Sequence, residues 1–306
     1  MSALPSEILQ RIAVGPAGWS YPDWHGTFYP ADSATNRCML PYVIRYFDTV
    51  EINSTFYRMP NLKTVENWLQ ISKKKESFSF CVKIWQGFTH SSRVAEPAML
   101  ESFSRVMQPL HENNKLGAVL IQYPWRTKYC EKNLADLTNL CSALAGLPLV
   151  IEFRHNSWNT VSLMDTLRQL GVGFVNIDQP LIGNSLPPTD YHTSSVAYFR
   201  FHGRNRENWF NESAGRDDRY NYLYSPAELD AWIPAISQCA EKAKKTFVIF
   251  NNHFRGQAVV NSFQMKEKLT GLKQNLPDSL VSSFPVLRSI TADTADGQTG
   301  LFPFLV

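Results

Sequence analysis

Short apolar runs recur along the chain, and amphipathic segments fill most of the gaps between them. The runs are rich in Val, Ile and Phe and are bounded by polar or turn residues, a pattern typical of buried strands in a parallel sheet. The eight predicted strands span residues 12–18, 49–54, 78–84, 117–123, 149–154, 173–178, 196–202 and 246–252.

Apolar residues at helical spacing predict helices in most of the intervening segments. These helices cover residues 37–47, 62–71, 97–112, 133–146, 160–171 and 225–245. Gly171 suits a helix C-cap, and Ser225 suits an N-cap with Pro226 at the first helical position. Residues 179–195 contain four prolines and glycines in total and no helical period, so we predict an irregular connection there.

Eight strand–helix units over about 250 residues predict an α/β fold, a closed (β/α)₈ barrel of the TIM type. An open, doubly wound sheet is the alternative, but such sheets normally carry G-x-G-x-x-G after the first strand, and "GPAGWSY" lacks it. We find no composition break or Gly/Ser linker, so residues 1–306 are predicted to form one domain, with a C-terminal extension over residues 271–306.

The composition supports a full hydrophobic core, since 44% of the residues are hydrophobic and 13% are aromatic. A net charge of +3 neither requires nor excludes a nucleic acid partner. The five cysteines are widely spaced without C-x-x-C, which favours free thiols in a reducing compartment. The N-terminus has no apolar run long enough for a signal peptide or a membrane span, so we expect a cytoplasmic protein without a membrane partner. The sequence does not indicate an oligomeric state.

Polar side chains end seven of the eight predicted strands, and the first strand leads into aromatic residues. In a (β/α)₈ barrel the active site forms at these carboxyl ends. A buried ion-pair network of this size would add little stability, because desolvation offsets the attraction, so the set as a whole favours a ligand site. The catalytic candidates are Glu51, Glu152, Asp178 and His202, and the ligand-binding candidates are Trp19, Tyr21, Asn53, Tyr57, Lys83, His90, Gln122, Arg154, Trp158, Arg200, Gly203, Arg204, Asn251 and Asn252.

The charges of these candidates favour an anionic ligand. Four of them are lysine or arginine, and arginine binds carboxylate and phosphate groups through two parallel hydrogen bonds. The turns after strands seven and eight contain Gly203 and Gly256, and many barrels bind phosphate in this region. We therefore expect a small anionic or phosphorylated ligand and a helix that begins near Gly256. The aromatic candidates would stack on a planar group or simply pack beneath the loops.

Six segments in order resemble the DUF72 family, also known as the YecE-like proteins. They are "VGPAGWSYPDWHGTFYP", "FDTVEINSTFYRMP", "FSFCVKIWQGFTH", "IEFRHNSW", "FRFHGR" and "FNNHFRGQAVVN", which together run from about residue 14 to 261. The resemblance implies a TIM-type barrel but supplies no reaction. The family's recurrent positions fall on most of the candidates above and also on Gly18 and Phe56. The chain departs from the pattern at Pro16–Ala17 and at Trp125, which affects loop shape more than chemistry.

Three functions are consistent with this sequence. The first is a cofactor-free hydrolase or lyase, in which Glu51, Glu152, Asp178 and His202 act as acids and bases while lysine and arginine hold the anionic substrate. The second is a metal-dependent phosphodiesterase or endonuclease of the xylose-isomerase-like kind, in which the same four residues bind one divalent ion. The chain has only seven histidines and no H-x-H or H-E-x-x-H, and nearby cations would repel the ion.

The third is a non-catalytic module that binds a nucleotide or a nucleic acid. The segment "HGRNRENWFNESAGRDDRYNY", residues 202–222, is long, charged and aromatic, so it could cover a ligand or bind a single strand. A surface loop without such a role is the simpler interpretation of the same residues.

Overall fold

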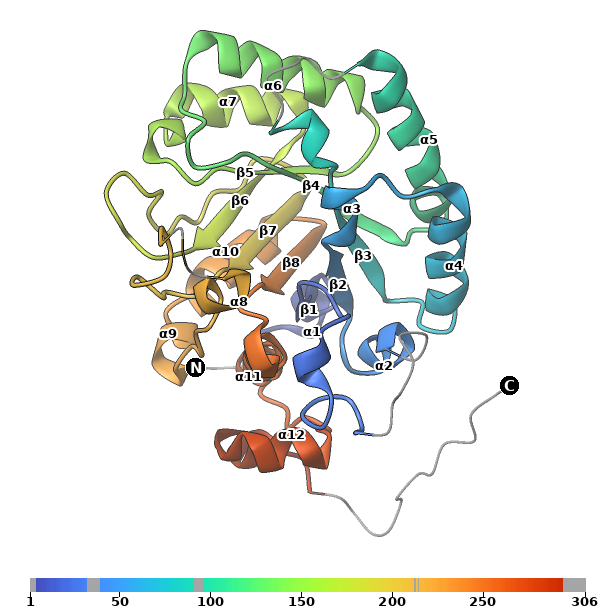
Figure 1. Cartoon of the computed structure of the whole chain (residues 1–306), viewed down its shortest axis with the longest axis vertical. Helices are drawn as coiled ribbons and strands as arrows, with labels where there is room; N and C mark the ends of the chain where they lie inside the picture. Colours follow the sequence, from blue (N-terminus) through green and yellow to red (C-terminus); the bar gives the residue numbers. More distant parts are fainter. Residues whose placement is uncertain (1–3, 32–38, 91–95, 212, 214, 294–306) are drawn as a thin grey trace.

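The computed structural model describes residues 4–31, 39–90, 96–211, 213 and 215–293. Parallel strands form its centre, and helices surround them (Figure 1). The barrel predicted from the hydrophobic pattern is confirmed, with neighbouring strands in the order β1-β8-β7-β6-β5-β4-β3-β2. The strands are β1 (Ile12–Pro16), β2 (Thr49–Ile52), β3 (Ser79–Lys83), β4 (Leu116–Gln122), β5 (Leu149–Glu152), β6 (Gly173–Asp178), β7 (Val196–Phe201) and β8 (Lys245–Phe250).

The barrel closes where β1 meets β2, the two ends of the strand order. Ala17 and Glu51 form an isolated parallel bridge there, and the amide of Gly18 donates to the carbonyl of Glu51 at 2.7 Å. A Cβ on Gly15 would lie 1.9 Å from the carbonyl oxygen of Thr49. Only glycine therefore allows the two backbones to come this close. We call this junction the β1–β2 seam.

Helices cover the outside of the barrel, and each predicted helix is present in some form (Figure 1). Gly171 ends α7 with a φ of 67°, as predicted, and the Ser225 side chain accepts from the amide of Glu228 to begin α9. The α-helices are α1 (Ser6–Leu9), α2 (Met39–Tyr46), α3 (Ser54–Tyr57), α4 (Leu62–Ser72), α5 (Pro97–Glu112), α6 (Glu131–Ala143), α7 (Val161–Leu170), α8 (Arg216–Arg219), α9 (Pro226–Asp230), α10 (Ile233–Lys242), α11 (Gln257–Thr270) and α12 (Asp278–Ser283). Short 3₁₀ turns lie at Pro22–Trp24, Gln86–Phe88, Asn156–Trp158, Phe254–Gly256 and Pro285–Ile290.

The helix predicted over residues 225–245 is wrong in one respect, because the chain breaks it into α9 and α10. Pro234 lies in the first turn of α10. A proline has no N–H to donate, so it fits the start of a new helix better than the middle of a long one. The break places Trp232 between the two helices, and its indole contributes to a cluster described below.

The connection from β6 to β7 contains no helix, which confirms the irregular crossover. Asn176 fastens it to the sheet, since its side chain accepts from Thr189 Oγ1 and the Tyr191 amide and donates to the Tyr191 carbonyl, at 2.8–2.9 Å. Toward the C-terminus of the chain, α12 and the 3₁₀ turn Pro285–Ile290 form the described part of the C-terminal extension; residues 294–306 lie outside the described residues.

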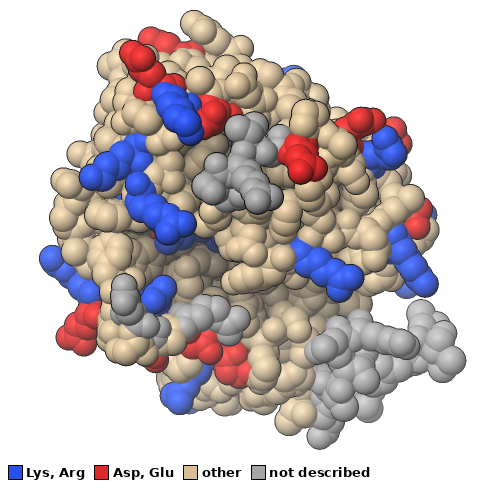
Figure 2. All heavy atoms as spheres, turned by 45° about the horizontal axis from the view of Figure 1, so that its top comes forward, with Lys and Arg blue, Asp and Glu red and all other residues tan. Residues whose placement is uncertain are grey.

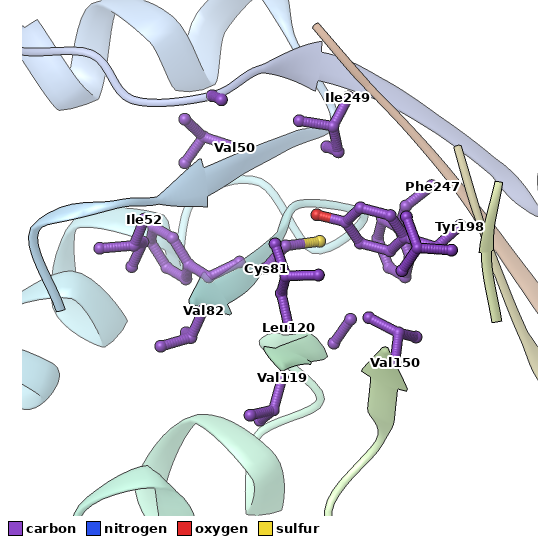
Figure 3. Close-up of a cluster of buried hydrophobic side chains, with 14 of the residues drawn as sticks. Val50, Ile52, Cys81, Val82, Val119, Leu120, Val150, Tyr198, Phe247 and Ile249 are labelled. Carbon is purple, nitrogen blue, oxygen red and sulfur yellow. The ribbon is translucent and has the colours of Figure 1, made fainter. Parts of the chain in front are cut away.

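An apolar floor fills the barrel below the strand ends. Cys81, Tyr198 and Phe247 project into it from β3, β7 and β8 (Figure 3). The four cysteines that the structure describes, at positions 81, 130, 141 and 239, carry free thiols. The Tyr198 hydroxyl donates to Glu51 at 2.8 Å, so this side chain joins the apolar floor to the charged layer above it. None of the described helices has the length and apolar character needed to cross a membrane.

Candidate functional site

A buried ion-pair network crosses the barrel just above Tyr198. Arg200 on β7 is 2% exposed and contacts two carboxylates. Its Nε and Nη2 donate to Glu51 at 2.9 and 2.6 Å, and its Nη1 donates to Glu152 Oε2 at 2.9 Å. Burial by itself would lower the pKa of Arg200, but the two carboxylates raise it well above the usual value, so its charge is permanent.

Glu152 is fully bonded within the same network. Besides Arg200 it contacts Arg154 Nε at 2.9 Å and His202 Nε2 at 3.2 Å. Burial by itself would raise the pKa of Glu152, but the charges of Arg200 and Arg154 and the contact with His202 hold the pKa well below its usual range. Glu152 therefore stays ionised at neutral pH and has no oxygen without a partner.

His202 is neutral and has a defined tautomer. Burial is the main reason that its pKa falls to about 3. A carboxylate can only accept, so Nε2 carries the proton and donates to Glu152. Nδ1 then accepts from Asn251 Nδ2 at 3.1 Å. Both ring nitrogens are occupied by protein groups, which leaves His202 no position from which to exchange a proton with a ligand.

A cavity of about 390 Å³ lies above this network, at the carboxyl ends of the strands. Figure 2 shows a hollow in one face of the molecule with lysine and arginine side chains beside it. The charged residues that line the cavity are the cations Lys83, Arg200 and Arg219, and no acidic side chain of the described residues lines it. The full lining is Tyr21, Asn53, Phe56, Tyr57, Lys83, Arg200, Arg219, Tyr220, Asn251 and His253, and we call this cavity the Lys83 pocket.

Lys83 ends β3 with its amine at the base of the pocket. The side chain is 9% exposed, and Nζ lies 3.9 Å from the centroid of the Phe56 ring. Within the described part of the chain, no carboxylate lies within ion-pair distance of Nζ. Burial lowers the pKa of Lys83 to about 7, and the charges of Arg200 and Arg154 add to this effect while Glu152 and Glu51 oppose it. Near neutral pH, Lys83 therefore exists in both protonation states.

Three polar side chains in or beside the pocket are unusual: two contain a buried atom without a hydrogen-bond partner, and the third has a lowered pKa. Asn53 Oδ1 and Arg219 Nε are buried atoms with no hydrogen bond among the described residues. His90, which follows β3, packs edge-on against Phe56 with the ring centroids 4.9 Å apart. Burial and then the charge of Lys83 lower the pKa of His90 to about 4, so the imidazole is neutral. Buried polar atoms without partners are costly, so Asn53 and Arg219 have unmet hydrogen-bonding capacity beside the pocket.

Asp178 and Arg204 do not join the pocket. Asp178 accepts from Arg204 Nε, the Tyr224 hydroxyl and the Trp232 indole, each at 2.8 Å. Trp232 packs against Phe201, on the helix-facing side of β7. The carboxylate thus binds the helix layer to the sheet, and its three donors favour a structural role.

Several other predicted ligand-binding residues do not line the pocket and instead contact protein groups elsewhere. The Trp158 ring stacks on Phe153 at 4.3 Å, and its indole donates to the Thr127 carbonyl. Trp19 packs edge-on against Trp68. The Gln122 side chain donates to the Tyr123 carbonyl, and Asn252 Nδ2 donates to Asn261 Oδ1 and the Tyr222 carbonyl.

The two glycine turns that suggested a phosphate site are bonded internally. Gly203 has a φ of 88°, and its amide donates to the Tyr224 hydroxyl at 2.8 Å. Helix α11 begins directly after Gly256, as predicted, but the amide of Arg255 in the preceding turn donates to the Asp23 carboxylate. An anion at these turns has less support than one in the Lys83 pocket.

The pocket thus includes six of the predicted site residues and four that were not among these candidates, although the family resemblance had pointed to Phe56. The predicted ones are Tyr21, Asn53, Tyr57, Lys83, Arg200 and Asn251, and the additional ones are Phe56, Arg219, Tyr220 and His253. Arg219 and Tyr220 belong to the charged, aromatic segment 202–222, whose composition suggested a ligand cover. His253 directly follows the last strand, a position that could have been included on the same grounds as Asn251.

The four residues of the metal-dependent alternative are not brought together. Glu51, Glu152 and His202 belong to the arginine network, whereas Asp178 lies on the helix-facing side of the strands. Among the residues with a described position, no three His, Cys, Asp or Glu side chains converge as metal ligands.

The fold and the pocket define an enzyme-like (β/α)₈ barrel with a cationic cavity at the carboxyl ends of its strands. The family model described as "Protein of unknown function DUF72" matches residues 13–283, and the chain belongs to this family.

The chain is similar in sequence to a curated protein and similar in both sequence and fold to solved structures. The UPF0759 protein YunF of Bacillus subtilis (strain 168) is 30% identical over 277 residues, which cover 84% of this chain and 94% of that protein. The crystal structure of a DUF72 family protein from Thermotoga maritima is 34% identical with a TM-score of 0.76, covering 84% of this chain and 98% of the other. A DUF72 family protein from Enterococcus faecalis gives 27% identity and a TM-score of 0.74, covering 86% and 97%.

Proposed function

We propose that this protein is an enzyme that performs acid–base chemistry, of the hydrolase or lyase kind, on a small anionic molecule bound over Lys83. The observation that supports it is the contrast between Lys83 and its neighbours. Glu51 and Glu152 are bonded to arginines, and both nitrogens of His202 are occupied, whereas Lys83 has no such partner and a pKa of about 7. A group with this pKa both donates and accepts a proton near neutral pH.

The charge of the pocket supports an anionic ligand. Arg200 and Arg154 balance the two carboxylates of the network, so the remaining positive charges are Lys83 and Arg219. Arg219 Nη2 donates to the Asn211 carbonyl, while its Nε has no hydrogen bond within the described structure. A carboxylate or phosphate would compensate both charges, and this chemistry needs no cofactor.

Chemical labelling tests the proposal directly. The rate of acetylation of Lys83 by acetic anhydride would be followed by peptide mass spectrometry across a pH series, with the exposed Lys63 as the internal reference. We expect a midpoint near pH 7 for Lys83 and slower labelling in millimolar phosphate or malonate. Labelling with the ordinary lysine profile, unchanged by either anion, would contradict the proposal.

Turnover provides the second test. A panel of phosphate esters and carboxylic acids would be screened with the wild-type protein, Lys83→Met and Lys63→Met. Any hydrolase or lyase activity should be lost in Lys83→Met and kept in Lys63→Met, because Lys63 lies on the exposed face of α4. Activity that survives in Lys83→Met would remove Lys83 from the mechanism.

A further inference from the structure

Acid–base chemistry does not by itself explain why a primary amine occupies the base of this pocket. A histidine or a carboxylate could exchange a proton there equally well, and the network below already contains both. An amine differs in that its neutral form is a nucleophile toward carbonyl carbon. We propose that Lys83 Nζ forms an imine with a small aldehyde or keto compound that carries a carboxylate or phosphate group, an inference that rests on the function proposed above.

The first argument is the accessibility of the nitrogen lone pair. Lys83 Nζ lies over the face of Phe56 at 3.9 Å and opens onto a cavity of about 390 Å³. The charged groups that face it are Arg200 on β7, Glu152 and Arg154 at the end of β5, and Glu51 on β2, with the neutral His90 beyond Phe56. Both carboxylates among them are held by guanidinium groups, so neither pairs with the amine.

The second argument is that this environment favours the neutral amine. Burial and the two nearby arginines disfavour the ammonium form, and the carboxylates compensate only in part. Desolvation beside other cations is the recognised way in which proteins activate a lysine for imine formation. A buried lysine that only balanced charge would instead be expected to have a carboxylate within ion-pair distance.

The third argument is that the pocket walls match the rest of such a substrate. Arg219 lines the cavity, and its guanidinium group would bind the anionic group. Asn53 lines the same cavity, and its side-chain amide would bond to a substrate hydroxyl. The lining of the pocket therefore combines a cation for the anionic group, an amide for a hydroxyl and a nucleophilic amine.

The chemical step balances without an oxidant or reductant. The lone pair of neutral Lys83 Nζ attacks the carbonyl carbon, the C=O π pair moves to oxygen, and the proton lost from nitrogen ends on that oxygen to give a carbinolamine. One further proton converts the hydroxyl into water, which leaves as the nitrogen lone pair forms the C=N bond. Amine, carbonyl and one proton taken up from solvent thus give a protonated imine and water, and this electron-withdrawing group suits lyase chemistry on the neighbouring carbon–carbon bond.

Reductive trapping tests this inference. The protein would be incubated at pH 7–8 with glyoxylate or pyruvate in one arm and glycolaldehyde phosphate in the other, each with sodium cyanoborohydride, and then mapped by mass spectrometry. We expect a stable secondary amine on Lys83 far in excess of that on Lys63. The arm that gives the higher yield identifies the preferred anionic group. Lys83→Met, shown to be folded by circular dichroism, should lose the modification at this site while the peptide containing Lys63 is unchanged.

A second variant tests the anion-binding wall. Arg219→Met should lower the trapping of glyoxylate by about tenfold or more. The trapping of acetaldehyde, which has no anionic group, should change little in the same variant. Equal losses for both compounds would contradict the role of Arg219 in binding the anion.

The outcomes also separate this inference from the function it rests on. If phosphate or malonate protects Lys83 from acetylation but no carbonyl compound is trapped on it, the imine is refuted and the acid–base function stands. If neither occurs, both are refuted. Trapping spread evenly over exposed lysines would also refute the imine, because it would show no property special to Lys83.

Discussion

At the residue scale, the two carboxylates and the lysine of the barrel interior differ in how their charge is compensated. Arg200 presents several donors in a fixed plane and bonds Glu51 and Glu152 together. A lysine is a single charge on a flexible chain, and its pKa moves readily when it is buried. The carboxylates therefore act as counter-ions, while Lys83 is the group whose protonation can change near pH 7.

Replacement of Lys83 by methionine should stabilise the protein. Lys83→Met removes a buried cation that lacks a partner and keeps an unbranched chain that packs on Phe56. We expect the free energy of unfolding in urea at pH 7 to rise by about 1–3 kcal/mol, at the expense of function. Lys63→Met is the control and should change it by less than about 0.5 kcal/mol. A clear loss of stability in Lys83→Met would show that the cation has a partner after all.

Replacement of Arg200 should have the opposite effect. Arg200→Met leaves Glu51 and Glu152 buried without their shared partner, which should cost about 3–5 kcal/mol. Adding Glu51→Gln in the same chain should recover part of this loss, because one of the unpaired charges is gone. A double-mutant cycle from urea unfolding measures the coupling; additive effects of the two substitutions would contradict the network.

At the element scale, the position of the site depends on the β1–β2 seam. The Ala17–Glu51 bridge closes the barrel at the residue that bonds Arg200, so the seam and the charged layer lie at the same level. Glu51 thus connects β2 to the end of β1 through its backbone and to Arg200 on β7 through its side chain. Packing of the two strands depends on the missing side chain of Gly15.

Gly15→Ala should open this seam. The added Cβ would meet a backbone carbonyl 1.9 Å away, which cannot rotate aside as a side chain would. We expect a loss of about 3 kcal/mol or more in thermal or urea unfolding. Gly146→Ala is the matched control, since its φ of 95° adds strain of about 1 kcal/mol but its Cβ would meet nothing within 4 Å. Similar losses in the two variants would show that the seam is more adaptable than described.

At the scale of the whole molecule, the buried titratable groups predict how stability depends on pH. The pKa of Lys83 falls from 10.5 to about 7 on folding, and that of His202 falls from 6.5 to about 3. The pKa of Glu152 also lies well below its usual 4.5. In each case the unfolded chain binds more protons between the two pKa values, so stability rises with pH across that interval.

We therefore expect the urea midpoint to rise from pH 4 to pH 9. His202 and His90 account for a rise below pH 6.5, and Lys83 accounts for a rise above pH 7. Lys83→Met should remove the alkaline part of this rise and leave the acidic part in place. Parallel curves for the wild-type protein and Lys83→Met above pH 7 would mean that the pKa of Lys83 is not lowered on folding.

The class of the barrel was predictable because strand and helix periods are local properties of the chain. The same pattern identified six residues of the pocket, since polar residues at strand ends meet at one end of a barrel. The pattern could not distinguish Asp178 from Glu152, because both residues end a strand. Which face of a strand points inward depends on its register with its neighbours, and Asp178 faces the helices whereas Glu152 faces the interior.

The sequence by itself determined the (β/α)₈ barrel, the polar side chains at the carboxyl ends of its strands and the excess of lysine and arginine among them. Only the tertiary structure decided which charges cancel. Arg200 and Glu51 are 149 residues apart, and Arg219 reaches the pocket from the short helix α8 beyond β7, so neither contact follows from a local pattern. The pKa of a side chain depends on burial and on every charge nearby. For that reason Lys83, one cation among several in the sequence, stands out only once the chain is folded.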